Sequence, residues 1–113
     1  MSSLSKSPIR IKSFEFACDI VRFSEVLKQQ KHFEIASQVL RSGTSIGANV
    51  REAQRGVSNK DFKHKFGIAL KEADETEYWL QLIEATILDE IPFNLKAKCD
   101  ELIRILVSII KNS

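Results

Sequence analysis

The sequence predicts an all-α protein, an antiparallel up-down-up-down bundle of four helices, and three observations lead to that fold class. The chain has 113 residues, of which 43% are hydrophobic and 28% charged, so it has room for one domain with its own core. Only four glycines and two prolines interrupt it, which disfavours an all-β fold with many turns. Apolar residues recur at spacings of three and four in four successive segments, the pattern of amphipathic helices joined by short links.

The first predicted helix follows an N-terminal arm. Residues 1–12 are rich in Ser and Lys and lack periodicity, so we expect a flexible or extended arm there and the bundle domain over residues 13–113. Ser13 can cap a helix that runs to about Gln30. This helix has a wide apolar face made of two stripes, which are Phe14, Ala17 and Val21, and Phe16, Ile20, Phe23 and Leu27.

The second helix should run from about Phe33 to Val57, although its middle is poor in helix-forming residues. Residues 42–49, SGTSIGAN, contain two glycines, and each costs about 1 kcal/mol relative to alanine inside a helix. The spacing continues on both sides, so we expect one helix in which Gly43 and Gly47 admit another backbone closely; the alternative is a loop that splits the segment. The apolar stripe consists of Ile35, Val39, Ser42, Ile46, Asn49 and Ala53.

The third and fourth helices have clearer limits. Ser58 can cap the third helix, with Asp61 near its positive end, and the pair Ile91-Pro92 stops it. We expect Pro92 in the first turn of the fourth helix. The third helix keeps a heptad spacing through Phe62, Phe66, Ala69, Ala73, Thr76, Leu80, Ile83 and Ile87. The fourth carries Leu95, Cys99, Leu102, Leu106 and Ile109.

A second apolar stripe on the third helix predicts self-association. Ile68, Trp79 and Leu82 lie beside the main seam. A monomeric bundle needs one stripe per helix, so the extra surface indicates burial against another subunit; the alternative is that Trp79 covers the edge of the bundle. The candidates for a subunit interface or for close packing are Gly43, Gly47, Asn49, Glu72, Glu75 and Trp79.

Charge is unevenly distributed along the chain, whose net charge is +2. Residues 1–60 carry ten Lys and Arg against five Asp and Glu, whereas residues 61–113 carry seven against ten. Such asymmetry can guide self-association or attract a polyanion. Arg51 and Arg55, one turn apart, repel each other unless an anion or a partner's carboxylate lies between them. The candidate nucleic-acid contacts are Arg41, Arg51, Arg55, Lys60, Lys63 and Lys65.

No pattern predicts catalysis or a cofactor. Asp61 and His64 form one carboxylate–histidine pair, and a metal site in a bundle needs a second copy of such a pair. Cys18 and Cys99 fall on apolar faces, where a reduced thiol behaves as a small hydrophobic group. We therefore expect no enzyme, no metal and no cofactor. The sequence has neither a membrane-spanning run nor the apolar core of a signal peptide, which favours a cytoplasmic protein without a membrane partner.

Five stretches of the chain carry a resemblance to a known family. They are KSFEFA at 12–17, LRSGTSIGANVREA at 40–53, SNKDF at 58–62, ALKEA at 69–73 and ETEYWL at 75–80. In order and spacing they resemble the proteins of the bacterial 23S ribosomal RNA intervening-sequence family. The resemblance implies a four-helix bundle, in relatives of which five copies assemble as a barrel-like ring. It also implies a relation to the accessory protein of diversity-generating retroelements, which binds a reverse transcriptase and nucleic acid through a basic ring.

These observations lead to a functional hypothesis with one alternative. We expect a non-catalytic homopentamer that associates with RNA, DNA or a ribonucleoprotein through its basic residues, so that each weak phosphate contact is multiplied. The alternative is a protein-interaction scaffold that binds no nucleic acid. In that case Glu72, Glu75 and the arginines pair between subunits, and the ring docks a protein partner such as a reverse transcriptase.

Overall fold

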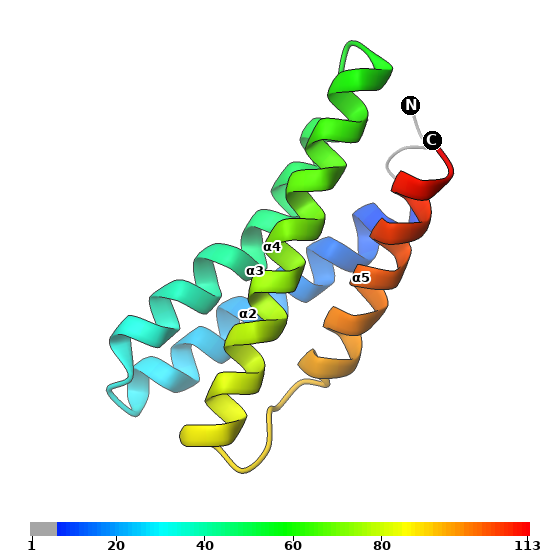
Figure 1. Ribbon diagram of the computed structural model, residues 1–113. Coiled ribbons are helices and arrows are strands. Elements are labelled where there is room, and N and C mark those ends of the chain that lie inside the picture. Colours follow the sequence, from blue (N-terminus) through cyan, green and yellow to red (C-terminus); the bar gives the residue numbers. More distant parts are fainter. Residues whose placement is uncertain (1–6) are drawn as a thin grey trace.

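The structure, a computed structural model, describes residues 7–113, and this part of the chain forms four α-helices and no strands (Figure 1). The helices are α2 (Pro8–Gln29), α3 (Phe33–Gln54), α4 (Asn59–Thr86) and α5 (Leu95–Lys111). The predicted all-α class with four helices is confirmed.

Helix α2 begins at Pro8, earlier than the predicted Ser13. Proline suits the first turn because its φ is already helical and the N–H that it lacks would have no partner there. The extra turn places Ile9 in the core. Ser13 is buried within the helix and caps nothing, since its hydroxyl donates to the carbonyl oxygen of Arg10 at 3.3 Å. The predicted arm over residues 1–12 is therefore wrong for residues 8–12, and residues 1–6 lie outside the described part of the chain.

Helix α3 runs unbroken through residues 42–49, so the alternative of a loop is wrong. Its hydroxyl side chains bond to the carbonyl oxygens one turn back. Thr44 Oγ1 donates to Leu40 at 2.7 Å, and Ser45 Oγ donates to Arg41 at 2.6 Å. These poor helix formers therefore satisfy their polar groups inside the helix.

The two glycines of α3 bring α2 and α3 close together. A Cβ on Gly43 would lie 2.8 Å from the side chain of Ile20, and a Cβ on Gly47 would lie 3.3 Å from the carbonyl oxygen of Ser13. The first distance is too short for any real Cβ, so only glycine allows this approach. Both glycines pack helices of the same chain.

The connection between α3 and α4 spans residues 55–58. Helix α3 ends at Gln54, before the predicted Val57, which lies in the connection and is 98% exposed. Ser58 caps α4 as predicted, because its Oγ accepts the N–H of Asp61 at 3.1 Å. This cap fixes where the chain re-enters a helix.

Helix α5 begins at Leu95, later than predicted. Phe93 and Asn94 have φ angles of 61° and 54°, a left-handed conformation that a right-handed helix cannot contain. Pro92 therefore lies in the connection between α4 and α5, and its predicted place in the first turn of α5 is wrong.

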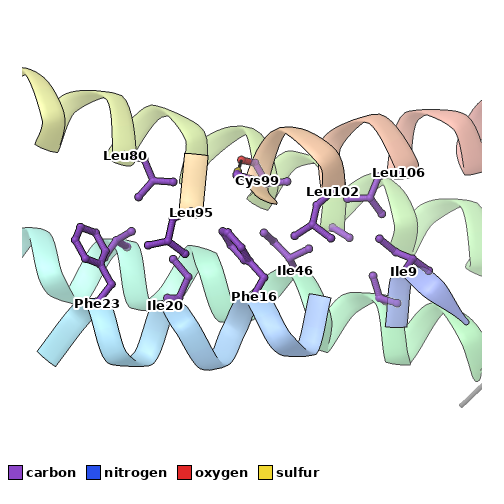
Figure 2. Close-up of a cluster of buried hydrophobic side chains, with 14 of the residues drawn as sticks. Ile9, Phe16, Ile20, Phe23, Ile46, Leu80, Leu95, Cys99, Leu102 and Leu106 are labelled. Carbon is purple, nitrogen blue, oxygen red and sulfur yellow. Dashed lines mark hydrogen bonds between the residues drawn. The ribbon is translucent and has the colours of Figure 1, made fainter. Parts of the chain in front are cut away.

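One core joins the four helices (Figure 2). The stripe of α2 that faces it begins with Ile9 and continues through Phe16, Ile20 and Phe23, which point into the space below α4 and α5 in Figure 2. The heptad seam predicted for α4 is buried from Phe66 to Ile83, but Phe62 and Ile87 are only half-buried, and the helix ends at Thr86, before the predicted stop at Ile91-Pro92. From α5 the core receives Leu95, Cys99, Leu102 and Leu106.

The contact between α3 and α4 is the most extensive in the molecule and has a polar centre. The hydroxyl oxygens of Ser42 and Thr76 lie 2.9 Å apart and are hydrogen-bonded, and both residues are completely buried. Thr76 Oγ1 also lies 2.8 Å from the carbonyl oxygen of Glu72. Each hydroxyl therefore has a partner within the apolar seam.

Contacts between the helices define two ends of the molecule. At the upper end in Figure 1, the α3–α4 connection meets the start of α2 and the end of α5. Hydrogen bonds hold these parts together, from Arg10 to Gln54 at 3.3 Å and from Lys12 to Glu101 at 3.0 Å. We call residues 7–14, 51–65 and 101–113 the basic end. The opposite end, residues 25–38 and 77–96, is called the acidic end.

Candidate nucleic-acid interface

The two ends differ in net charge. The basic end carries nine Lys and Arg against three Asp and Glu, whereas the acidic end carries three against six. This polarity along the long axis is distinct from the asymmetry along the sequence, because each half of the chain contributes to both ends. A polyanion would be attracted to one end only.

Four of the six candidate nucleic-acid contacts lie together at the basic end as exposed cations without an ion pair in residues 7–113. They are Arg51 and Arg55 in and just after the last turn of α3, and Lys60 and Lys63 in the first turns of α4. Within residues 7–113, neither Arg51 nor Arg55 has a carboxylate at ion-pair distance to offset their repulsion. Their charges are available to an anion from outside.

The other two candidates are engaged in ion pairs. Arg41 lies between Glu72, at 3.1 Å, and Glu75. The hydrogen bond between Arg41 and Glu75 raises the pKa of the arginine, and that bond together with one from Trp79 Nε1 lowers the pKa of Glu75. Arg41 is also ten residues, or about 15 Å along the helix, from Arg51.

Lys65 lies at the basic end, and its ammonium is 2.9 Å from a carboxylate oxygen of Glu52. The hydrogen bond to Glu52 raises the pKa of Lys65. Unlike its neighbours Lys60 and Lys63, Lys65 has a carboxylate partner of its own, so we do not count it among the free cations.

The candidates for interface or close packing lie in different surroundings. Gly43 and Gly47 pack against α2, and Asn49 Nδ2 donates to the carbonyl oxygen of Ser45 at 2.9 Å, within its own helix. Glu72 and Glu75 are paired inside the chain, as described above. Trp79 is half-buried: its Nε1 donates to Glu75 at 3.0 Å, and its ring meets that of Tyr78 edge-on.

An exposed aromatic at the basic end was missed by the sequence reasoning. Phe14 belongs to the stripe of α2 that faces outward, and it is 54% exposed. The guanidinium carbon of Arg51 lies 5.3 Å from the centre of its ring. The sequence places Phe14 on one of two apolar stripes, and nothing in its spacing says which stripe faces the core.

The acidic end has aromatic surface of its own. A shallow groove there is lined by Phe33, Glu34, Ile35 and Trp79, among others. Phe33 is 60% exposed, and Tyr78, next to Trp79, is 57% exposed. At this end Glu34 lines the groove and Glu75 accepts the hydrogen bond of Trp79, whereas Phe14 has the guanidinium of Arg51 over its ring.

The Cys99 thiol is buried and protonated. Burial raises the pKa of the Cys99 thiol to about 12, so the thiol keeps its proton at neutral pH. Within residues 7–113 no three His, Cys, Asp or Glu side chains are grouped in a way that could hold a metal ion. None of the helices between residues 7 and 113 has the length and apolarity to cross a membrane.

Comparisons with known proteins agree with this fold. The family model described as 23S rRNA-intervening sequence protein matches residues 6–108. A similar solved structure is the crystal structure of a protein with unknown function from the S23 ribosomal protein family of Bacteroides thetaiotaomicron. It is 45% identical, with a TM-score of 0.85 over 91% of this chain and 98% of that one. No curated protein matches the sequence.

Proposed function

Because the chain belongs to the 23S rRNA-intervening sequence protein family, we propose that it is a non-catalytic, cytoplasmic, homo-oligomeric bundle that binds nucleic acid through its basic end. The observation that carries this proposal is the group of four exposed cations that form no ion pair within the described residues, Arg51, Arg55, Lys60 and Lys63. Phosphates would neutralise them, with release of condensed counterions.

Two energetic points support a phosphate ligand. Arg51 in the last turn of α3 and Arg55 just after it are like charges four residues apart, and they repel each other. Lys60 and Lys63 stand near the positive end of the α4 dipole, where cations are disfavoured. A bound phosphate would offset both the repulsion between the arginines and the unfavourable position of the lysines. The basic end is therefore suited to an anionic ligand.

We propose that each chain is an up-down-up-down bundle and that five copies form a ring. The contacts of α2 with α3 support the up-down order, since Arg10, Ser13 and Ile20 meet successively earlier residues of α3. Exposed apolar surface on α4, including Tyr78 and Leu82, supports burial between copies. A ring would present five basic ends, so weak phosphate contacts would add up.

The test measures the anisotropy of a labelled structured RNA titrated with the protein at several salt concentrations. We expect binding that weakens steeply with salt, and its loss in the double variant Arg51→Glu and Arg55→Glu. The matched control, Lys28→Glu with Lys31→Glu, makes the same change in total charge at the acidic end and should retain binding. No binding by the wild type at low salt, or equal loss in the control, would contradict the proposal.

The second candidate is a protein-interaction scaffold, and the aromatic groove of the acidic end favours it. Its apolar rings and carboxylates suit a basic, partly apolar protein surface. In this case the basic end contributes no binding, and the titration above gives no salt-dependent signal. The two functions are thus separated by one experiment.

A further inference from the structure

A groove between α2 and α3 at the basic end combines an aromatic ring, an unpaired arginine and a floor of small residues. It has a volume of about 280 Å³ and is lined by Phe14, Ala17, Thr44, Gly47, Ala48 and Arg51. Three of the lining residues, Ala17, Gly47 and Ala48, have a methyl side chain or none, so little side-chain volume fills the groove. Phe14 and Arg51 form its edge, with the guanidinium over the ring at 5.3 Å.

The geometry points to a stacking site for an unpaired nucleobase in this groove, so that the ligand of the basic end is single-stranded nucleic acid. Bases stack on aromatic rings and on guanidinium planes, and the groove presents both, more than half of the Phe14 side chain being exposed. In a duplex the faces of each base are covered by its neighbours, so only an unpaired base can enter. This inference rests on the proposed nucleic-acid function and specifies its ligand.

The charges around the groove favour a nucleotide over a protein partner. Arg51 has no carboxylate partner in residues 7–113, and Arg55 follows four residues later, just after the end of α3. A base in the groove would have its phosphates within reach of this row of arginines. An apolar protein surface would instead bury Arg51 without neutralising it, which is costly.

Thr44 is placed to line the groove without competing for a ligand. Its hydroxyl donates to the carbonyl oxygen of Leu40 at 2.7 Å, so its proton is already used and its methyl group is left to the groove. The floor of the groove therefore offers apolar contact to a base, and the Thr44 hydroxyl has no proton left to donate to it. We expect stacking with little preference among bases.

The experiment compares a labelled oligouridine strand with the same strand annealed to its complement. We expect tighter binding of the single strand by the wild type. Phe14→Leu, which keeps an apolar side chain and removes the ring, should weaken single-strand binding by about 5- to 150-fold, the equivalent of one base stack, with an unchanged salt slope. Phe14→Tyr should restore binding.

Two further variants separate stacking from charge and from folding. Arg51→Lys keeps the positive charge but removes the planar guanidinium on which a base can stack. It should therefore lower the affinity for the single strand without changing the salt slope. Phe93→Leu makes the same ring removal at an exposed aromatic of the acidic end and should leave binding as it is. Circular dichroism of each variant checks that the helices are retained.

The outcomes distinguish this inference from the function on which it rests. If the wild type binds neither strand nor duplex, the proposed nucleic-acid function fails. If it binds both equally and Phe14→Leu has no effect, nucleic-acid binding stands and the stacking site is refuted. If Phe14→Leu changes the oligomer mass in light scattering while binding is kept, the groove is an interface between copies, and the stacking site is again refuted.

Discussion

The basic and acidic ends carry similar apolar rings in opposite electrostatic surroundings. At the basic end Phe14 lies under Arg51, which has no carboxylate partner in the part of the chain that the structure describes. At the acidic end Trp79 donates a hydrogen bond to Glu75, and the nearby groove includes Glu34. Exposed aromatic surface alone therefore says little about the partner, and the charge beside each ring decides which kind of ligand it can accept.

The largest effect is expected from a change that disrupts the close approach on which the basic end depends. Gly43→Leu would place a side chain where a Cβ already lies 2.8 Å from Ile20, so we expect a loss of about 1–3 kcal/mol or more in unfolding free energy. Urea unfolding measures it. The control is Gly67→Leu on α4, where nothing lies within 4 Å of a Cβ, and where leucine should stabilise the helix. Equal stability of the two variants would contradict the packing account.

The second change addresses the acidic end. Trp79→Ala removes the largest apolar group of its groove, and we expect a smaller oligomer mass in light scattering, with RNA affinity reduced only through lost multivalency. Val107→Ala, at another exposed apolar position on α5, is the control and should leave the mass unchanged. An unchanged mass together with lower thermal stability would assign Trp79 to the edge of the single bundle.

The smallest effect is expected for the RNA affinity of a variant at Arg41, which tests where the binding surface of the basic end stops. Arg41→Gln should change RNA affinity by less than about twofold, because this guanidinium is already paired with Glu72 and Glu75. Arg55→Gln should instead reduce the magnitude of the salt slope by about 0.7 for a single strand. Equal reductions in both variants would place Arg41 in the interface after all.

The stabilising effect of Arg41 should depend on pH. The pKa of Glu75 is lowered mainly by its hydrogen bond with Arg41, so the pair stabilises the fold above the ordinary pKa of a carboxyl group. That contribution is lost as the pH falls through the lowered pKa. The difference in melting temperature between wild type and Arg41→Gln should therefore shrink in acid. The pair is partly exposed, so the difference is small at any pH.

Periodicity predicted the helices well and their limits less well, since α3 ends before Val57 and α4 before Ile91. The seam of α4 and the cap at Ser58 follow from local spacing and local hydrogen bonding, which the sequence contains directly. The start of α2 was placed too late because Ser13 is a good capping residue, whereas burial of Ile9 extends the helix to Pro8. Phe93 and Asn94 adopt left-handed φ angles that no local pattern required.

The candidate interface could be predicted only in part. The basic residues are visible in the sequence, but which of them are neutralised depends on contacts across helices, such as Arg41 of α3 with Glu75 of α4. Phe14 and Phe16 are two residues apart and equally apolar, and only packing determines that Phe16 is buried while Phe14 is exposed. The groove exists because Phe14 is the exposed one, so it could be found only from the packing of the helices and not from the sequence.

The hydrogen-bonded hydroxyls of Ser42 and Thr76 affect the register in which α3 packs against α4. A seam with regular heptad spacing can slide by one repeat and still match apolar groups, so it leaves the register of α3 and α4 ambiguous. A slide would leave the buried Ser42 hydroxyl against carbon, at a cost of about 1–3 kcal/mol for that unsatisfied group, whereas Thr76 would keep its hydrogen bond to Glu72 in its own helix. The pair therefore selects one register, and with it the height at which Lys60 and Lys63 stand beside Arg51 and Arg55.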